Sequence, residues 1–118
     1  MADNSPIAHA VVAALNARDF SALAALADEE IALSGFGGGM DMGREALRER
    51  LARHFQASDE TYGDALVMED RSGGNIAVRL TARGWSPDGT ARSREAALLI
   101  EVEEGRVLRL ALLSSGGS

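Results

Sequence analysis

The sequence contains no cysteine and no lysine, and these two absences exclude several kinds of chemistry. Without cysteine there is no disulfide, thiol nucleophile, zinc–thiolate site or iron–sulfur cluster. Without lysine there is no Schiff-base chemistry, no lysine base and no Walker-type phosphate loop. The two histidines, His9 and His54, show no HExxH spacing, so we expect neither a metal nor any other cofactor.

Positive charge is also scarce. Twelve basic residues face 18 acidic ones, and the formal net charge is −6. A surface of this sign repels phosphate backbones and anionic lipids, so we expect no nucleic-acid partner and no membrane partner. No apolar run approaches the roughly 20 residues that cross a bilayer. The N-terminus lacks the pattern of a signal peptide, and together with the missing cysteines this predicts a cytoplasmic protein.

The length of 118 residues fits one domain over residues 1–118. Hydrophobic residues make up 46% of the chain and charged residues 25%. This composition supports a folded core and differs from that of disordered or collagen-like chains. We expect the core to span about residues 7–114, and the Ser- and Gly-rich residues 115–118 to form a flexible tail.

The first part of the chain is predicted to be helical. A helix begins near Ser5, and apolar residues recur at helical spacing as far as Leu15. A second, short helix follows, with Asp19 or Ser21 as its cap. A short strand is predicted over residues 31–33.

A glycine-rich loop is predicted over residues 34–43, and a third helix follows it. The apolar stripe of that helix is Leu47, Leu51, His54 and Phe55, spaced i, i+4, i+7 and i+8. The loop lacks the GxGxxG and Walker patterns, so it is not predicted to bind a nucleotide. It is expected to be either a plain loop or a flexible lid.

The second part of the chain is predicted to form strands. They cover residues 62–70, 76–85, 91–103 and 107–113, separated by turn signals. Because the helices come first and a meander of strands follows, we predict an α+β fold with three N-terminal helices packed on one face of an antiparallel sheet.

Alternation along these strands assigns the two faces of the sheet. The apolar face carries Val78, Leu80 and Ala82, then Ala96, Leu98, Ile100 and Val102, then Leu108, Leu110 and Leu112. The other face mixes arginines, glutamates and a tryptophan with several aliphatic residues. A wholly solvated face would hold fewer aliphatics, so this face is predicted to bind a second copy of the chain.

Four segments carry a resemblance to a known family. They are residues 12–23 (VAALNARDFSAL), 26–31 (LADEEI), 43–47 (GREAL) and 103–107 (EEGRV). In this order and spacing they resemble the first helix and turn, the second-helix end, the third-helix entry and the final hairpin of SnoaL-like and ketosteroid-isomerase-like proteins. The resemblance to this nuclear transport factor 2-like superfamily covers roughly residues 7–114.

The resemblance implies a cone-shaped fold, in which three helices pack against a strongly curved antiparallel or mixed sheet. It also implies an apolar pocket inside the cone and a homodimer formed through the convex face of the sheet. The residues predicted to line the pocket are Val11, Leu15, Phe36, Met40, Leu51, Phe55, Leu80, Leu98, Ile100, Leu110 and Leu112.

The catalytic set of the ketosteroid isomerases is missing. Those enzymes use a carboxylate base with an oxyanion hole made of a tyrosine and a protonated aspartate. The base position falls near Ser34 or Gly35, the tyrosine positions on Val11 and Leu51, and the protonated-acid position on Leu98. No Arg/Asp pair like that of the related epoxide hydrolases is found on the inward strand faces either.

Asp41 and His54 are the candidate catalytic residues. Asp41 lies near the base position of the family, between Met40 and Met42, and an apolar mouth would make its carboxylate a stronger base. The alternative is a solvated loop aspartate. His54 is a candidate acid or orienting donor, and the alternative is a histidine packed at the helix–sheet boundary. For His9 a surface position is favoured.

Four strand arginines, Arg79, Arg83, Arg92 and Arg94, are candidates for binding an anionic substrate. Cross-strand ion pairs or dimer contacts are favoured instead, because Arg79 and Arg83 share a face with Glu95, Glu101 and Glu103. Trp85 is predicted to be an interface or rim aromatic. A register shift of one residue would turn these side chains inward.

The predicted partner is therefore a small apolar molecule. The resemblance and Asp41 favour an enzyme of the isomerase, cyclase or hydrolase type. The missing catalytic set and the apolar inward face favour a non-catalytic binding domain or a structural dimerisation domain.

Overall fold

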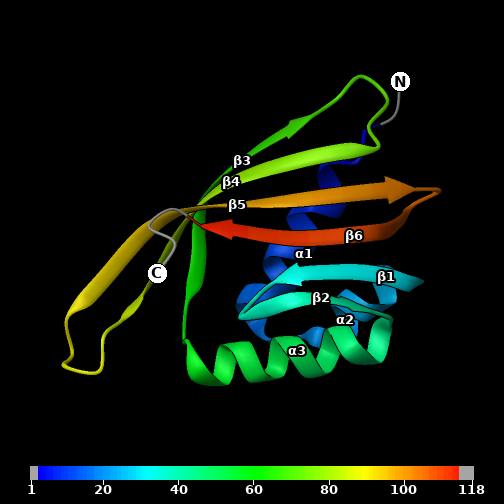
Figure 1. Ribbon diagram of the computed structural model, residues 1–118. Helices are drawn as coiled ribbons and strands as arrows, with labels where there is room; N and C mark the ends of the chain where they lie inside the picture. The colour runs from blue at the N-terminus through cyan, green and yellow to red at the C-terminus, as the bar shows by residue number, and fades with distance from the viewer. Residues whose placement is uncertain (1–2, 115–118) are drawn as a thin grey trace.

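The computed structural model describes residues 3–114 (Figure 1). Within them lie α1 (Ser5–Ala17), α2 (Phe20–Leu26), β1 (Ala27–Gly35), β2 (Gly38–Met42), α3 (Arg44–Ala57), β3 (Thr61–Glu69), β4 (Asn75–Trp85), β5 (Ala91–Glu103) and β6 (Arg106–Ser114). The predicted α+β class is confirmed. The third helix, however, follows the first two strands instead of preceding the sheet. The predicted tail at residues 115–118 lies outside the described residues.

The strands form one mixed sheet, in the order β2-β1-β6-β5-β4-β3. β1 and β6 run parallel, and every other neighbouring pair is antiparallel. The helices cover one face: α1 packs against β3, and α3 packs against β1 and β2. The turn ends of β4 and β5 extend past the other strands as a long, bent hairpin (Figure 1).

A tight turn joins α1 to α2. Arg18 ends α1 in the left-handed region (φ 58°), and the backbone N–H of Asp19 donates to the carbonyl of Ala14 at 2.9 Å. The side chain of Asp19 then accepts from the N–H of Ala22 at 3.1 Å and caps α2. This is the usual role of an N-terminal aspartate, and the predicted Asp19 cap is confirmed.

The glycine-rich segment is a β-hairpin, so the prediction of a loop or lid over residues 34–43 is wrong. Ala32 pairs with Met42 and Leu33 with Asp41, which makes β2 the edge strand of the sheet. Glycines at both ends of the Phe36 turn have positive φ (Gly35 79°, Gly37 85°). Glycine adopts such angles without steric cost, so the chain can make a tight turn here and return as β2. The glycine-rich composition alone had suggested an irregular loop.

The face assignment is confirmed on β4 and β5, whose inward residues are buried. On β6 it is partly wrong: Val107 is fully buried, whereas Leu108 is only half-buried. A register shift between Glu101 and Val102 pairs Val107 with Val102. Because a shift of one residue exchanges the two faces of a strand, the bulge turns Val107 into the core.

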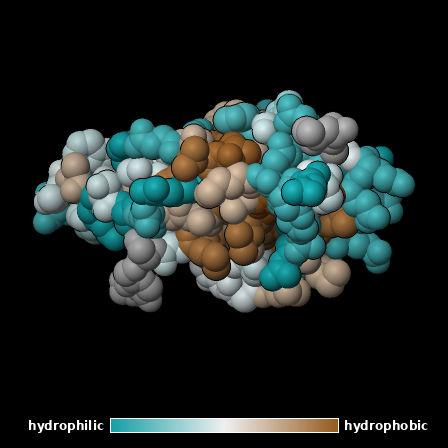
Figure 2. Space-filling view, turned by 90° about the horizontal axis from the view of Figure 1, so that it is seen from above, coloured by the Kyte–Doolittle hydropathy of each residue, from teal (hydrophilic) through white to brown (hydrophobic). Residues whose placement is uncertain are grey.

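Large exposed hydrophobic residues gather on the opposite face of the sheet. We call Leu66, Met68, Leu99 and Leu113 the outer patch. Cross-strand pairing continues it through small residues, since Ala77 pairs with both Met68 and Leu99. Seen from the β3 side, the molecule has a hydrophobic area at its middle, flanked by hydrophilic ends (Figure 2).

Ion pairs flank the outer patch. Arg79 pairs with Glu95 at 3.1 Å, and Arg109 pairs with Glu101 at 3.6 Å. The predicted cross-strand ion pair of Arg79 is confirmed. Arg83 pairs with Asp64 on β3, at 2.6 Å.

Candidate functional site

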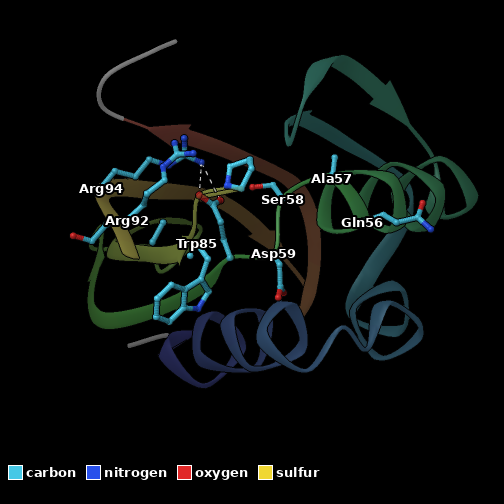
Figure 3. A pocket seen from close by; sticks show the side chains of 12 residues that line it. Gln56, Ala57, Ser58, Asp59, Trp85, Arg92 and Arg94 are labelled. Carbon is cyan, nitrogen blue, oxygen red and sulfur yellow. Dashed lines mark hydrogen bonds and ion pairs between the residues drawn. The ribbon is translucent and has the colours of Figure 1, made fainter. Parts of the chain in front are cut away.

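Two adjoining clefts lie at the C-terminal end of α3. The α3 cleft, of about 420 Å³, is lined by Phe36, Gly37, Gly38, Asp41, Arg50, Arg53, His54, Ala57 and Ser58. The hairpin cleft, of about 410 Å³, is lined by residues 56–60 and by Ala82, Gly84, Trp85, Pro87, Arg92, Ser93 and Arg94. Ala57 and Ser58 belong to both. Figure 3 shows the hairpin cleft between the α3–β3 connection and the β4–β5 hairpin.

The α3 cleft brings the two predicted catalytic residues, Asp41 and His54, to one place. Asp41 is 41% exposed and its Oδ2 lies 2.7 Å from a guanidinium nitrogen of Arg50. Arg50 is itself buried and also donates to the carbonyls of Gly35, at 2.7 Å, and Gly39. The carboxylate therefore has a fixed cationic partner, in place of the apolar surroundings that the sequence suggested.

His54 is half-buried beside two aromatic rings. Its ring centroid lies 5.5 Å from that of Phe36 and 4.8 Å from that of Phe55. Burial lowers the pKa of His54 below its ordinary 6.5, because a charged imidazolium loses its hydration, although nearby Glu60 acts in the opposite direction. Its Nε2 is buried without a hydrogen-bond partner among the described residues. At neutral pH His54 is therefore an uncharged imidazole, able to accept a proton.

We expect the His54 pKa to be visible in the stability of the fold. The unfolded chain binds this proton at higher pH than the folded chain, so the free energy of unfolding should fall as pH drops below about 6.5. The loss should continue until folded His54 is protonated too. His54→Gln should remove this part of the pH dependence, and His9→Gln should keep it. Urea unfolding between pH 4 and 8 measures the effect, and equal profiles for wild type and His54→Gln would contradict it.

A partly buried ion pair between Glu60 and Arg94 was not predicted from the sequence. Both carboxylate oxygens of Glu60 approach Nη2 of Arg94, at 2.9 and 2.8 Å, and Figure 3 marks these contacts by dashed lines. This pair differs from the Arg/Asp pair of the epoxide hydrolases, because its acid is a glutamate that precedes β3. Arg94 has the same strand parity as inward Ala96 and Leu98, which was a usable signal. Glu60 precedes β3 and gave no such signal.

The end of α1 holds the segment that carries Glu60. Arg18 donates to the carbonyl of Glu60 at 2.6 Å and to Asp59 at 2.9 Å, and its guanidinium lies 4.0 Å from the Phe55 ring centre. Asn16 exchanges two hydrogen bonds with the backbone of Tyr62, at 2.7 and 2.9 Å. Through these contacts the end of α1 holds the α3–β3 connection, which borders both clefts. The contacting residues are more than 40 positions apart in the chain.

Tyr62 is buried next to this pair. Burial raises the pKa of its phenol well above the ordinary 10, and Glu60 raises it further. Its hydroxyl has no hydrogen-bond partner among the described residues. Tyr62 is therefore a neutral donor throughout the physiological pH range.

Most of the residues predicted to line a pocket fill the core instead. Side chains without accessible surface are Val11, Leu15, Leu51, Leu98 and Leu110, and nearly so are Leu80, Ile100 and Phe36. Phe55 is buried, Leu112 half-buried, and Met40 is 60% exposed on β2. Of this set, Phe36 borders the α3 cleft. The α3 cleft and the hairpin cleft thus lie at the end of the helix–sheet sandwich, beyond the packed aliphatic layer.

The remaining candidates are at the surface. His9 is exposed on α1, and Trp85 is 71% exposed on the long hairpin. Within residues 3–114 no group of three or more His, Cys, Asp or Glu residues is arranged to hold a metal ion. In the same part of the chain, no helix is both long and apolar enough to cross a membrane.

The SnoaL-like domain family matches the chain over residues 8–110. This match spans most of the 118 residues, so the chain belongs to the SnoaL-like family. No curated protein matches it at a significant level of sequence similarity.

Solved structures share the fold at low sequence identity. A candidate polyketide cyclase from Xanthomonas campestris pv. campestris has a TM-score of 0.84 and 20% identity, with 92% of this chain and 87% of that one covered. Bal32a, from a soil-derived mobile gene cassette, has a TM-score of 0.81 and 20% identity, covering 96% and 89%. SalBIII is an epoxide hydrolase/cyclase-like enzyme of pyran ring formation in salinomycin. It has a TM-score of 0.80 and 19% identity, with 96% of this chain and 91% of that one covered.

Proposed function

We propose that this chain binds a small, largely apolar molecule at the α3 cleft and catalyses a proton transfer on it, as an isomerase, cyclase or hydrolase does. The observation that carries the proposal is His54, an imidazole kept neutral by burial at the wall of an open cleft. An imidazole that is uncharged near pH 7 can accept a proton, as a general base must. The cyclase names of structurally similar proteins support the same class of reaction.

The proposed roles follow from the contacts. His54 accepts the proton, because Asp41 is held by Arg50 while His54 forms no ion pair within residues 3–114. Glu60 raises the pKa of His54, so its negative charge stabilises the imidazolium formed after transfer. Asp41, the predicted base, supplies a fixed negative charge in the α3 cleft. Phe36 forms the apolar part of the wall.

Thermal unfolding against a panel of steroids, terpenoids and aromatic polyketides tests the binding step. A ligand at about 100 times its dissociation constant adds roughly 2.7 kcal/mol to the free energy of unfolding. For a domain of this size the midpoint should rise by several degrees. Absence of any shift across the panel would contradict binding of an apolar ligand.

Product analysis by mass spectrometry then tests catalysis with each ligand that binds. We expect turnover by the wild type, at least a hundredfold slower turnover by His54→Gln, and unchanged turnover by His9→Gln. Because the chain has only these two histidines, the pair is a matched control. Turnover that survives His54→Gln at full rate would remove the assigned role.

A second candidate function is binding without catalysis. The missing catalytic set of the ketosteroid isomerases favours it, because apolar Val11, Leu51 and Leu98 stand where those enzymes carry polar groups. If a ligand raises the unfolding midpoint but no ligand is converted to product, binding without catalysis is the function, and the enzyme proposal fails.

We further propose that the outer patch forms a homodimer interface. Its four large hydrophobic side chains are exposed to water, and residues of both charge signs flank them. A two-fold contact requires a self-complementary surface, which this mixture provides. The partner is then a second copy of the chain, bound through the sheet face opposite the helices.

Sedimentation at micromolar concentration tests the dimer. The wild type should sediment at twice the chain mass of 12.4 kDa, and Leu99→Glu at the mass of one chain. Met40→Glu alters a hydrophobic residue on β2 that is more exposed than Leu99 and lies outside the patch, and this variant should stay dimeric. A wild type that sediments as a single chain would end the proposal.

A further inference from the structure

The hairpin cleft contains one positive charge that has no ion-pair partner among the described residues. Four charged residues line it, Asp59, Glu60, Arg92 and Arg94. Glu60 is paired with Arg94, and Asp59 is paired with Arg18, which lies outside the lining. Arg92 has no hydrogen bond or ion pair within residues 3–114. The cleft is therefore locally positive in a protein whose formal net charge is −6.

The position of Arg92 directs this charge into the cleft. Arg92 precedes Arg94 by two residues on β5, so both side chains leave the same face of the strand. Across the ladder Arg92 pairs with Gly84, which has no side chain to cover it. A Cβ at Gly84 would lie 3.4 Å from Cγ of Glu60, so the glycine also brings the Glu60–Arg94 pair close to Arg92.

Hydrogen-bonding capacity in the cleft is likewise one-sided. The acceptors Asp59 and Glu60 already receive hydrogen bonds from Arg18 and Arg94. Unused donors remain on the guanidinium of Arg92 and on Gln56 and Ser58, whose side chains make no hydrogen bond among the described residues. A ligand that fits such a site brings acceptor oxygens, and a guanidinium matches the two oxygens of a carboxylate.

We propose that the hairpin cleft is a binding site for a small organic carboxylate, with Arg92 as the residue that pairs with the carboxylate group. The volume of about 410 Å³ accommodates a ligand with an apolar body next to the acid. Ala57, Ala82 and Pro87 supply apolar wall for that body. This site is independent of the reaction proposed for the α3 cleft.

Isothermal titration with naphthalene-2-carboxylate and with its neutral amide, naphthalene-2-carboxamide, tests the proposal. We expect the carboxylate to bind the wild type about fivefold more tightly than the amide, the effect of one partly solvated charge pair. Added sodium chloride should weaken binding of the carboxylate and leave the affinity of the amide unchanged. Equal affinity of the two probes, or binding of neither, would overturn the proposal.

Two variants locate the site. Arg92→Gln should abolish the preference for the carboxylate. Arg53→Gln removes another unpaired arginine, from the adjoining α3 cleft, and should keep the preference. A preference lost in Arg53→Gln and kept in Arg92→Gln would overturn the assignment. A melting shift with the neutral panel but no carboxylate preference would overturn this inference and leave the proposed function standing.

Discussion

Gly35→Ala should lower the free energy of unfolding by about 3 to 5 kcal/mol, a large fraction of the total stability of a small domain. Gly35 has a φ of 79°, and a Cβ added to it would lie 2.4 Å from the carbonyl oxygen of Leu112. That oxygen belongs to the backbone of β6, so the contact cannot be relieved by a side-chain rotation. Either the β1–β2 hairpin or the parallel β1–β6 pairing must move.

Gly89→Ala is the matched control. Gly89 has a φ of 84° but no atom within 4 Å of an added Cβ. Its substitution therefore reports the conformational cost alone, about 1 to 2 kcal/mol. Urea unfolding of both variants separates that cost from the steric one. Equal losses of stability would show that the contact with Leu112 does not constrain the sheet.

Arg50→Met should lower the free energy of unfolding by about 3 kcal/mol, because one side chain satisfies three acceptors. Its guanidinium contacts the carbonyls of Gly35 and Gly39 and the carboxylate of Asp41. Methionine has a similar length and keeps the apolar packing, so the loss reports the hydrogen bonds and the charge. The amides of the β1–β2 hairpin should also exchange with deuterium faster than in the wild type.

Arg48→Met provides the comparison on the same helix. Arg48 pairs with Glu45 at 3.2 Å on the solvent side of α3. Exposed pairs at this spacing contribute about 0.5 kcal/mol or less. If the two variants lost equal stability, Arg50 would have no special role in holding the hairpin against α3.

The predicted Arg50 effect also bears on the candidate site. Asp41 and Phe36 reach the α3 cleft from the β1–β2 hairpin, and His54 reaches it from α3. Arg50 bonds these two elements together. If Arg50→Met loosens the contact between the β1–β2 hairpin and α3, ligand binding in the α3 cleft should weaken. Binding in the hairpin cleft should change much less.

Local sequence signals predicted the parts of the fold that depend on near neighbours. Apolar residues at helical spacing marked the helices. Asp19 was one of two predicted caps of α2, because capping involves residues three apart, and the structure selects it over Ser21. Alternation assigned Val78, Leu80 and Leu98 to the buried face. The aliphatic residues on the other face followed from the same alternation.

The site residues were predicted only where they lie on such a local pattern. His54 was found because it lies along the apolar stripe of α3. Asp41 was found because it lies in the glycine-rich segment, near the base position of the family that the sequence resembles. The Glu60–Arg94 pair was missed because its members are 34 residues apart. Strand parity with Ala96 and Leu98 could have placed Arg94 on the inward face, but this signal was not used, and nothing local placed an acid next to Arg94.

By itself the sequence determined the α+β class, the order of the helices and strands after residue 43, and the division of the sheet into a buried and an exposed face. These depend on periodicity and capping, which act over a few residues. Only the tertiary structure decided that residues 34–43 form a hairpin, that β1 lies parallel to β6, and that Asn16 and Arg18 hold the chain around Glu60. Such pairings are selected by packing and hydrogen bonding between segments distant in the chain, where no local pattern records the partner.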